Sequence, residues 1–386
     1  MESTTKLYSL NYTNANTYLF AFVFIVGNVV LPQLCHLVHL GGPAMLPIYF
    51  FTLIGAYKYG FKVGMLTAVL SPLVNSFLFG MPSVTILPAI LVKSVLLALV
   101  AGYMADRFRK ITIPALLGTV MAYQVVGTLI EYNVMRDCPD MLPDTEAAAG
   151  IWPWSCDNTL VQFNEVSGHK APWDAQGFDS DWNCRGTVIQ YNYSHDNYGG
   201  LVLVCNDGTA DASFNVGNLG TIVRYNVSIG DGVRPEPTRA GMFSPAVHLA
   251  GPVKDSRITR NIIHVNRKPA ADIDRTMITL DSWGGYPDST FISGNIFYAP
   301  ESSRFQLTES THNFFEGNYY LGRFEKLPED GKACQSAEIY QKEVLAKDEN
   351  GYQGLALLMD TVEVTGVKGV FVNKEAIENF FSRLEK

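Results

Sequence analysis

The stretch Gly127-Thr-Leu-Ile-Glu-Tyr-Asn-Val134 decides the fold, because the chain repeats it at intervals. Close copies are Asn158-Thr-Leu-Val-Gln-Phe-Asn-Glu165, Gly186-Thr-Val-Ile-Gln-Tyr-Asn-Tyr193 and Gly220-Thr-Ile-Val-Arg-Tyr-Asn-Val227. Looser copies are Ser256-Arg-Ile-Thr-Arg-Asn-Ile262, Ser289-Thr-Phe-Ile-Ser-Gly-Asn-Ile296 and Thr311-His-Asn-Phe-Phe-Glu-Gly-Asn-Tyr319. The aligned asparagines, separated by 31, 28, 34, 35, 34 and 23 residues, are Asn133, Asn164, Asn192, Asn226, Asn261, Asn295 and Asn318.

Each copy combines a short strand rich in β-branched residues with a terminal asparagine. Asparagine suits the tight turn after a strand, because its side chain bonds nearby backbone groups. Units of this kind bury their apolar face only against their neighbours, so they stack into a solenoid. The sequence therefore predicts an all-β, right-handed parallel β-helix over residues 127–323, with an internal ladder of asparagines. An antiparallel sandwich is the alternative, although it would not need an asparagine at the end of every unit.

The repeat also resembles right-handed parallel β-helix proteins of the pectate-lyase-like class. The resemblance rests on Ala149-Gly-Ile-Trp-Pro-Trp-Ser-Cys-Asp157, Gln176-Gly-Phe-Asp-Ser-Asp-Trp-Asn-Cys-Arg185 and Tyr191-Asn-Tyr-Ser-His-Asp-Asn197. It implies a protein that binds or cleaves polysaccharide or oligosaccharide outside the cytoplasm, as a polysaccharide lyase or a glycoside hydrolase. The motifs specific to polygalacturonases and pectate lyases are absent, so the resemblance implies the fold more than the reaction.

Counting back from the asparagines places a group of polar residues on one face of successive coils. Asp179 and His248 each lie thirteen residues before a ladder asparagine, and Asp281 lies fourteen before one. Asp181 points to the same side as Asp179 in an extended strand. Carboxylates and an imidazole on one face suit general acid–base catalysis on a glycosidic or uronate substrate. The alternative is an ordinary solvated face.

The same face suggests two further roles. Asp179 and Asp181 together could hold Ca²⁺, which takes carboxylate oxygens. Four tryptophans offer planes on which sugar rings can stack, and these candidates for substrate binding are Trp152, Trp154, Trp182 and Trp283. Cys156 and Cys184 lie eight residues before their asparagines; we expect stacked free thiols, with a disulfide as the alternative.

Residues 1–126 have a different composition from the remainder of the chain. They contain nine charged residues, seven of them basic, whereas the remaining residues carry a net charge of -13. The acidic remainder shows no basic stripe, which argues against nucleic acid as a partner. So few charges predict a helical bundle in a lipid bilayer. We predict about five spans, at Tyr18–Leu37, Ala44–Tyr57, Val63–Phe79, Val84–Tyr103 and Ile111–Val126.

The basic residues of this part predict its topology. Lys6, Lys58 with Lys62, and the run Asp106–Lys110 fall at alternate ends of the spans. The positive-inside rule places these segments, and with them the N-terminus, in the cytoplasm. Five crossings of the cytoplasmic membrane then deliver the β-helix to the extracytoplasmic side.

Residues 15–126 also resemble the substrate-binding S component of energy-coupling factor transporters. The resemblance rests on Leu31-Pro-Gln-Leu-Cys-His36, Gly41-Gly-Pro-Ala-Met-Leu-Pro47, Ser71-Pro-Leu-Val-Asn-Ser76 and Phe79-Gly-Met-Pro82. It implies uptake of a vitamin or another nutrient together with a transmembrane coupling subunit and ATPases. Lys93 lies in the middle of a span, where an ionisable group commonly serves a ligand or a wet cavity. Lys93 is therefore a candidate ligand-binding residue.

The three parts lead to competing functions. Residues 324–386 form a C-terminal extension in which Lys374–Lys386 reads as an amphipathic helix, which we expect to cap the last coil. Our leading hypothesis is a membrane-tethered, extracytoplasmic β-helix that binds or cleaves polysaccharide. The alternatives are a nutrient-uptake component with the β-helix as a passenger, and a non-catalytic adhesive or structural solenoid. The first repeat follows the fifth span without a linker, so an artefactual chimera is also an alternative.

Overall fold

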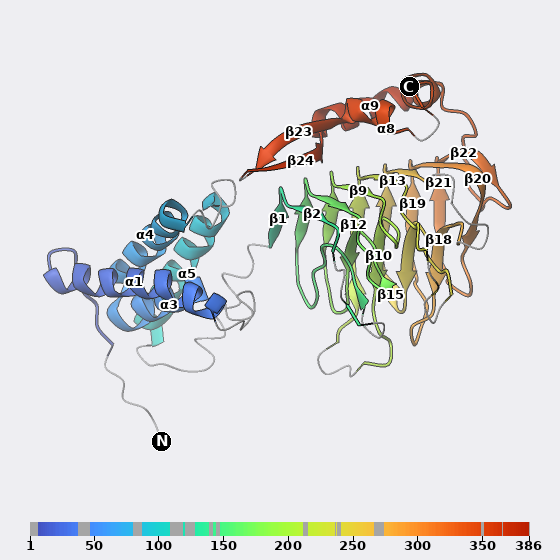
Figure 1. Cartoon of the computed structure of the whole chain (residues 1–386). Coiled ribbons are helices and arrows are strands. Elements are labelled where there is room, and N and C mark those ends of the chain that lie inside the picture. The colour runs from blue at the N-terminus through green and yellow to red at the C-terminus, as the bar shows by residue number, and fades with distance from the viewer. Residues whose placement is uncertain are drawn as a thin grey trace. The chain divides into compact units, whose positions relative to one another are not determined.

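The computed structural model describes most of the chain, as two units. The described residues are 7–37, 47–79, 87–108, 119, 128–138, 142–143, 147–210, 215–235, 237, 241–265, 274–348, 351–364 and 366–385. The chain divides into Met1–Gly127 and Thr128–Lys386, each compact in itself. Figure 1 shows that the first unit is helical and that the second is built mainly of strands.

Helices occupy four of the five predicted spans of the first unit. They are α1 (Ala15–Leu37), α3 (Pro47–Tyr59), α4 (Phe61–Phe79) and α5 (Leu87–Phe108). The fifth predicted span lies outside the described residues, apart from Thr119. Among the described residues, only α4 is long and apolar enough to be a candidate for crossing a membrane. The bundle of five spans therefore stays a prediction.

The helical unit buries polar side chains and exposes large apolar ones. The Asn28 amide donates to the Thr52 and Ser71 hydroxyls, at 3.1 Å each, and its oxygen accepts from a backbone N–H at 3.2 Å. All three of these polar side chains are buried. Phe22 of α1 is 64% exposed and Phe77 of α4 is 90% exposed. The helical unit also buries apolar side chains such as Phe24 and Val63, so large apolar side chains lie both in its interior and on its surface.

The second unit is a coil of parallel strands that form three stacks. Stack one runs in the order β1-β4-β8-β12-β16-β19-β21, and every neighbouring pair in it is parallel. Its strands are β1 (Leu129–Glu131), β4 (Leu160–Gln162), β8 (Val188–Gln190), β12 (Ile222–Arg224), β16 (Arg257–Thr259), β19 (Phe291–Ser293) and β21 (Phe314–Glu316).

Stacks two and three are joined by the long strand β20 into one sheet. Stack two contains β2 (Val134–Arg136), β5 (Glu165–Ser167), β9 (Tyr193–His195), β13 (Val227–Ile229), β17 (Ile262–His264), β20 (Ile296–Gln306) and β22 (Tyr319–Phe324). Stack three contains β7 (Phe178–Ser180), β10 (Val202–Cys205), β14 (Val247–Ala250), β18 (Thr276–Asp281) and the end of β20. The parallel repeating order is that of the predicted β-helix; a right-handed coil is what the chirality of parallel crossovers predicts.

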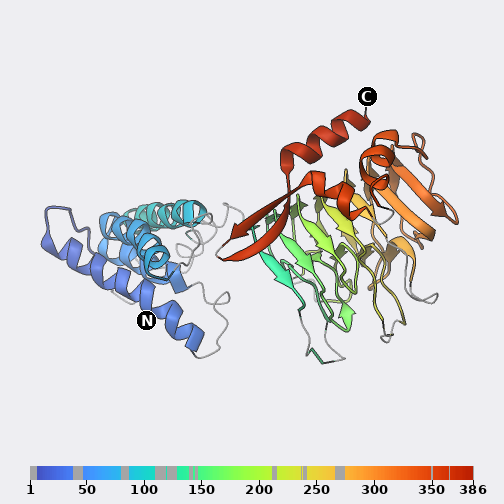
Figure 2. The same cartoon turned by 45° about the horizontal axis from the view of Figure 1, so that its top comes forward.

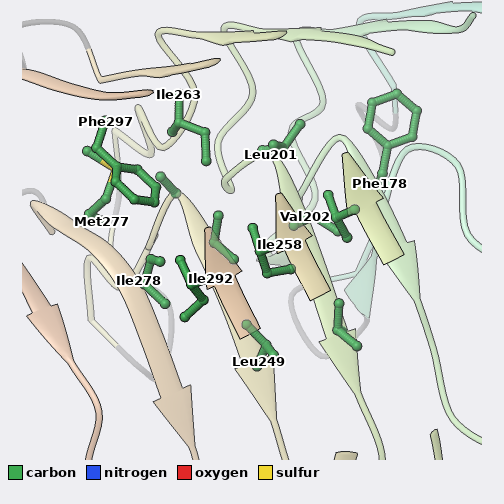
Figure 3. Close-up of a cluster of buried hydrophobic side chains, with 14 of the residues drawn as sticks. Phe178, Leu201, Val202, Leu249, Ile258, Ile263, Met277, Ile278, Ile292 and Phe297 are labelled. Atoms are coloured by element: carbon green, nitrogen blue, oxygen red, sulfur yellow. The ribbon is translucent and has the colours of Figure 1, made fainter. Parts of the chain in front are cut away.

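Two short pairs lie beside the stacks, and both are parallel. One joins β3 (Ala147–Ala148) to β6 (Trp173–Asp174), and the other joins β11 (Asn218–Leu219) to β15 (Val253–Lys254). The interior between the stacks is a single apolar core. Figure 3 shows Val202, Leu249 and Ile278 of stack three in one cluster with Ile258 and Ile292 of stack one. All five side chains are fully buried.

The seven predicted asparagines lie one above another. The Asn133 amide donates to the Asn164 oxygen at 2.8 Å, and the same bond links each asparagine to the next as far as Asn318, at 2.9–3.0 Å. Each of these side-chain oxygens also accepts from the backbone N–H of the preceding asparagine, as that of Asn192 does from Asn164 at 3.0 Å. The predicted ladder is confirmed. It ends at Asp330, whose carboxylate accepts from the Asn318 amide at 2.9 Å.

The residue before each ladder asparagine adopts a left-handed backbone conformation. Tyr132, Phe163, Tyr191 and Tyr225 have φ between 50° and 56°, which is uncommon for residues with a β-carbon. Their rings stack at centroid distances of 5.3–5.4 Å. The asparagine bonds hold this turn and the aromatic contacts add to its stability, so the corner between stacks one and two repeats without glycine in the first four coils.

The C-terminal extension covers the last coil with Asp330 and Cys334 and then packs along the coils. The terminal helix, which we expected to form the cap, lies beside Tyr191 and Tyr225 instead, so that expectation was wrong. The extension has several short elements. It contains α7 (Glu338–Tyr340), the single-turn elements at Gln341–Leu345 and Ala356–Leu358, α8 (Tyr352–Leu355), the hairpin β23 (Met359–Val364) with β24 (Val367–Val372), and α9 (Lys374–Leu384). Figure 2 shows the hairpin and α9 beside the stacked strands. The reason is the aromatic corner, an apolar ridge that Phe381 meets at Tyr225 and Phe371 at Tyr132.

The ladder predicts a graded response to substitution. Asn226 is fully buried and bonds both neighbours in the ladder, so Asn226→Ala should lower the free energy of unfolding by about 3 kcal/mol, because several buried groups lose their partners. Asn133 makes similar bonds at the exposed end, so Asn133→Ala should have an effect of about 1 kcal/mol. Equal losses in urea denaturation would contradict the ladder's role.

Candidate functional site

The strand register of stack three brings most of the predicted site residues onto one outward face. Asp179 of β7 pairs with Leu203 of β10, which pairs with His248 of β14. Their chain neighbours, such as Phe178 and Leu249, belong to the core. Because side chains alternate along a strand, Asp179 and His248 face outward in one column, as their equal spacing from the ladder predicts.

Asp281 and Asp181 lie on the same face, two residues further along their strands. Asp281 pairs with Ala250, so it stands one column away from His248. The spacing argument missed this shift because the segment between β18 and its ladder asparagine is longer than its counterpart. The Asp281 carboxylate lies 3.7 Å from Nε2 of His248, which is an ion-pair distance and too long for a hydrogen bond.

A pocket of about 170 Å³ opens on this face. His248 forms part of it and is held edge-on between two aromatic rings, Phe243 at 5.1 Å and Trp283 at 5.7 Å between centroids. Aromatic walls around a few polar groups are typical of ligand sites. The lining residues are Trp173, Asp174, Gln176, Arg234, Phe243, His248, Asp281 and Trp283.

Several lining residues could not be found from the repeat, since they lie outside its strands. Asp174 ends β6, and it and the following Ala175 have φ of 56° and 64°. The buried Arg234 comes from the segment between β13 and β14 and donates to the Ala171 and Pro172 carbonyls at 3.0 and 2.7 Å. The only sequence signal for Asp174 was its position five residues before Asp179.

Five buried polar atoms at or beside the pocket lack a hydrogen-bond partner among the described residues. Native interiors satisfy nearly all such groups, so each exception calls for an explanation. Both donors and acceptors are present, which suits a ligand that carries hydroxyl groups. The atoms are Gln176 Oε1, Asp179 Oδ1, Arg234 Nε, His248 Nε2 and Thr279 Oγ1.

The pKa values of the carboxyl groups on this face are shifted in different directions. Burial raises the pKa of Asp179 well above its usual value, and the nearby Asp181 and Asp174 raise it further. Burial and then the Asp181 charge also raise the pKa of Asp174, although His248 and Arg234 act in the opposite direction. The interaction with His248 lowers the pKa of Asp281. Carboxyls whose environments separate their pKa values in this way are suited to act as acid and base.

The pKa of Asp181 is subject to opposing effects. Burial raises its pKa, against the hydrogen bonds that its Oδ1 accepts from the Cys205 thiol at 3.1 Å and the Trp182 N–H at 2.7 Å. These bonds favour the ionised form. Asp181 is therefore the member of the buried carboxyl group best placed to carry the negative charge.

The residues do not fit the calcium site that the sequence suggested. Asp179, Asp181 and Cys205 offer ligand atoms within 4.8 Å of one another. Ca²⁺ takes six to eight oxygen ligands, whereas this group offers two carboxylates and a thiol. Burial raises the pKa of the Cys205 thiol well above its usual value, which keeps it protonated. We assign no metal to this face.

The remaining candidate residues are four tryptophans and two cysteines of the second unit and one lysine of the first. Trp182 and Trp283 pack on Leu203, Cys205 and Ala250, whereas Trp152 and Trp154 are 46% and 52% exposed. Lys93 is half-buried on α5 in the helical unit. Cys156 and Cys184 are free thiols, and burial raises the pKa of Cys184 to about 12.

The raised pKa of Asp179 predicts that Asp179→Asn stabilises the protein. The wild type loses stability as pH rises from about 3.9, the value in the unfolded chain, towards the higher value in the folded protein, because the folded state holds the proton more tightly. The variant lacks this loss, so its thermal midpoint should exceed that of the wild type at pH 7, with the difference vanishing near pH 3.

Asp288→Asn is a control for which we expect a change of opposite sign in the thermal midpoint. Hydrogen bonds from His312 and Thr311 lower the pKa of the half-buried Asp288 to about 2, so removing its charge should lower the midpoint slightly at pH 7. A lower midpoint for Asp179→Asn at pH 7 would contradict the assignment of a buried, protonated carboxyl.

Comparisons with known proteins relate part of the chain to a glycosidase. No protein-family model matches the chain. The chain is 25% identical over 201 residues to a protein named lacto-N-biosidase from Bifidobacterium longum subsp. longum. The match covers 50% of this chain and 11% of that protein, so the chain spans about a tenth of its relative. The resemblance of residues 15–126 to transporter S components is supported by neither comparison and stays a prediction.

Proposed function

We propose that the second unit is a glycoside hydrolase whose active site is the pocket on the outer face of stack three. The observation that carries the proposal is the separation of carboxyl pKa values at an aromatic-walled pocket. Burial raises the pKa of Asp174, which lines the pocket, whereas the interaction with His248 lowers the pKa of Asp281, which also lines it. Glycoside hydrolysis needs one carboxyl to protonate the leaving oxygen and a second to act as nucleophile or base. The match to a lacto-N-biosidase supports the same reaction class.

Asp174 is the proton donor in this proposal. It lines the pocket, and its raised pKa keeps the proton available at a pH where an ordinary aspartate has lost it. Burial and then the charge of Asp181 raise the pKa of Asp174 and so help it to retain the proton. Asp179 does not line the pocket, so we assign it no direct role in proton transfer.

Two carboxylates can serve as the ionised partner. Asp281 lies in the pocket beside His248. Asp181 accepts hydrogen bonds from Trp182 and Cys205 that favour its ionised form, although burial raises its pKa. If Asp281 is the ionised partner, His248 holds its carboxylate in place for the reaction. If Asp181 is the partner, His248 stabilises the negative charge of the acidic group. A lyase that abstracts a uronate proton would use the same face, but it would require no protonated Asp174.

Kinetics of Asp174→Asn, Asp181→Asn and Asp281→Asn test these roles. We expect wild-type protein to release reducing ends from a panel of oligosaccharides and aryl glycosides, and Asp174→Asn to lower kcat about 10²–10⁴-fold. Activity should fall as pH rises through the raised pKa of Asp174, because the acid must be protonated. Azide should restore activity to the variant that has lost the nucleophile and not to a variant that has lost a positioning carboxylate.

Asp157→Asn is the matched control, because Asp157 is exposed and pairs with Arg185 away from the pocket. This variant should retain wild-type kinetics. Products with a double bond in the new terminal sugar would show a lyase instead. Binding of glycans with no cleavage would support the adhesive alternative.

We further infer that the first unit lies in a lipid bilayer and tethers the second to the extracytoplasmic side. Its exposed surface carries large apolar side chains such as Phe22 and Phe77, while Asn28, Thr52 and Ser71 satisfy one another inside. Polar groups that bond one another between helices are suited to a lipid environment. The nutrient-uptake alternative would need a ligand at Lys93, and no observation favours it over tethering.

The variant Leu70→Lys separates a lipid-facing from a water-facing surface. Leu70 lies in the middle of α4 and is 41% exposed. In a bilayer the lysine would oppose insertion by about 3 kcal/mol, so less protein should remain in carbonate-washed membranes. Phe77→Lys, near the helix end, should have a smaller effect because a lysine there reaches the interface. Wild-type protein in the carbonate-soluble fraction would contradict the tether.

A further inference from the structure

Trp152 and Trp154 are exposed although the residues beside them are not. Their exposed fractions are 46% and 52%, while Pro153 between them is buried and Ile151 packs against the core. The alternation of an extended strand therefore turns both indole rings outward. Two large aromatic side chains left in solvent side by side are a common mark of a ligand surface.

Hydrogen bonds place this pair directly beside the acidic group of the pocket face. The Asp179 N–H donates to the Ile151 carbonyl, and the Asp181 N–H donates to the Pro153 carbonyl, each at 3.1 Å. Ile151 pairs with Phe178 in parallel register. Trp152 consequently lies next to Asp179, and Trp154 next to Asp181, one strand spacing of about 4.8 Å away.

Aromatic rings continue from this pair towards the pocket. Trp182 and Trp283 cover the next strands, where they pack on Leu203, Cys205 and Ala250. Trp283 also lines the pocket and touches His248. The outer face of stack three thus carries tryptophans from its first coil to the pocket, along the axis of the solenoid.

The pocket itself accommodates a short ligand only. Its volume is about 170 Å³, well below the roughly 300–1,000 Å³ of sites that enclose a larger ligand. A longer glycan must therefore leave the pocket and lie on the surface. The tryptophans offer flat apolar faces there, which suit the C–H faces of sugar rings.

We propose that Trp152 and Trp154 form a second sugar-binding position, and that the substrate is an oligosaccharide chain laid along the solenoid axis. One end of the chain occupies the pocket, and a sugar further along stacks on the two indoles, past the acidic group. The inference rests on the proposed glycoside hydrolase function. It makes Trp152 and Trp154 determinants of substrate length that contact sugars away from the bond that is cleaved.

The test compares the full chain with Trp152→Ala/Trp154→Ala on one glycan series of increasing length. The ratio of kcat/KM for the longest to the shortest substrate should fall about tenfold in the double variant, because a stacked aromatic contact corresponds to roughly this factor. The loss should appear in KM. Phe314→Ala is the matched control, since Phe314 is 51% exposed on stack one, and its ratio should equal that of the wild type.

An unchanged ratio in an active double variant would overturn the proposal. If the wild type cleaves none of the glycans, the proposed hydrolase function fails, and binding measured by titration calorimetry decides about the indole pair. Affinity for the long glycan that disappears in the double variant would sustain the second position. Equal affinity in both proteins, or binding to neither, would contradict it.

Discussion

The hydrogen bond from one asparagine side chain to the next is the interaction on which the β-helix depends. Each ladder amide also bonds the backbone of its own or a neighbouring coil, as Asn226 does with the Ile189 carbonyl at 2.9 Å. The ladder therefore sets both the spacing of the coils and the turn between stacks one and two. Because it fixes the register of every coil, it also fixes which residues of stack three stand side by side.

The site depends on that register and on residues from segments that interrupt the repeat. The repeat supplies Asp179, His248 and Asp281 on one outward face. Segments that interrupt the repeat then bring Asp174 and Arg234 against this face. They bury its carboxyl groups, and burial raises the pKa of Asp179 and Asp174. Loops that carry function on a regular scaffold are a general arrangement, and here they change the chemistry of groups that would otherwise be solvated.

Some site residues belong to the repeat and others to irregular segments, and this difference explains how much of the site the sequence could predict. The ladder spacing predicted the stacked asparagines and the common face of Asp179 and His248, because both depend on a local pattern repeated in every coil. It missed Asp174 and Arg234, whose positions depend on tertiary packing of irregular segments. It also assumed that α9 covers the last coil, whereas Phe381 of α9 packs against Tyr225 of the aromatic corner. The predicted five spans remain a prediction based on composition.

The central claim is that the ladder presents a sugar-binding face on stack three. A crystal structure of Asp174→Asn soaked with an intact oligosaccharide tests it most directly. The account predicts one sugar ring in the pocket between Trp283 and Asp174, with its hydroxyls bonded to Gln176 and Arg234. Sugar density on another face of the solenoid, with this pocket empty, would contradict it.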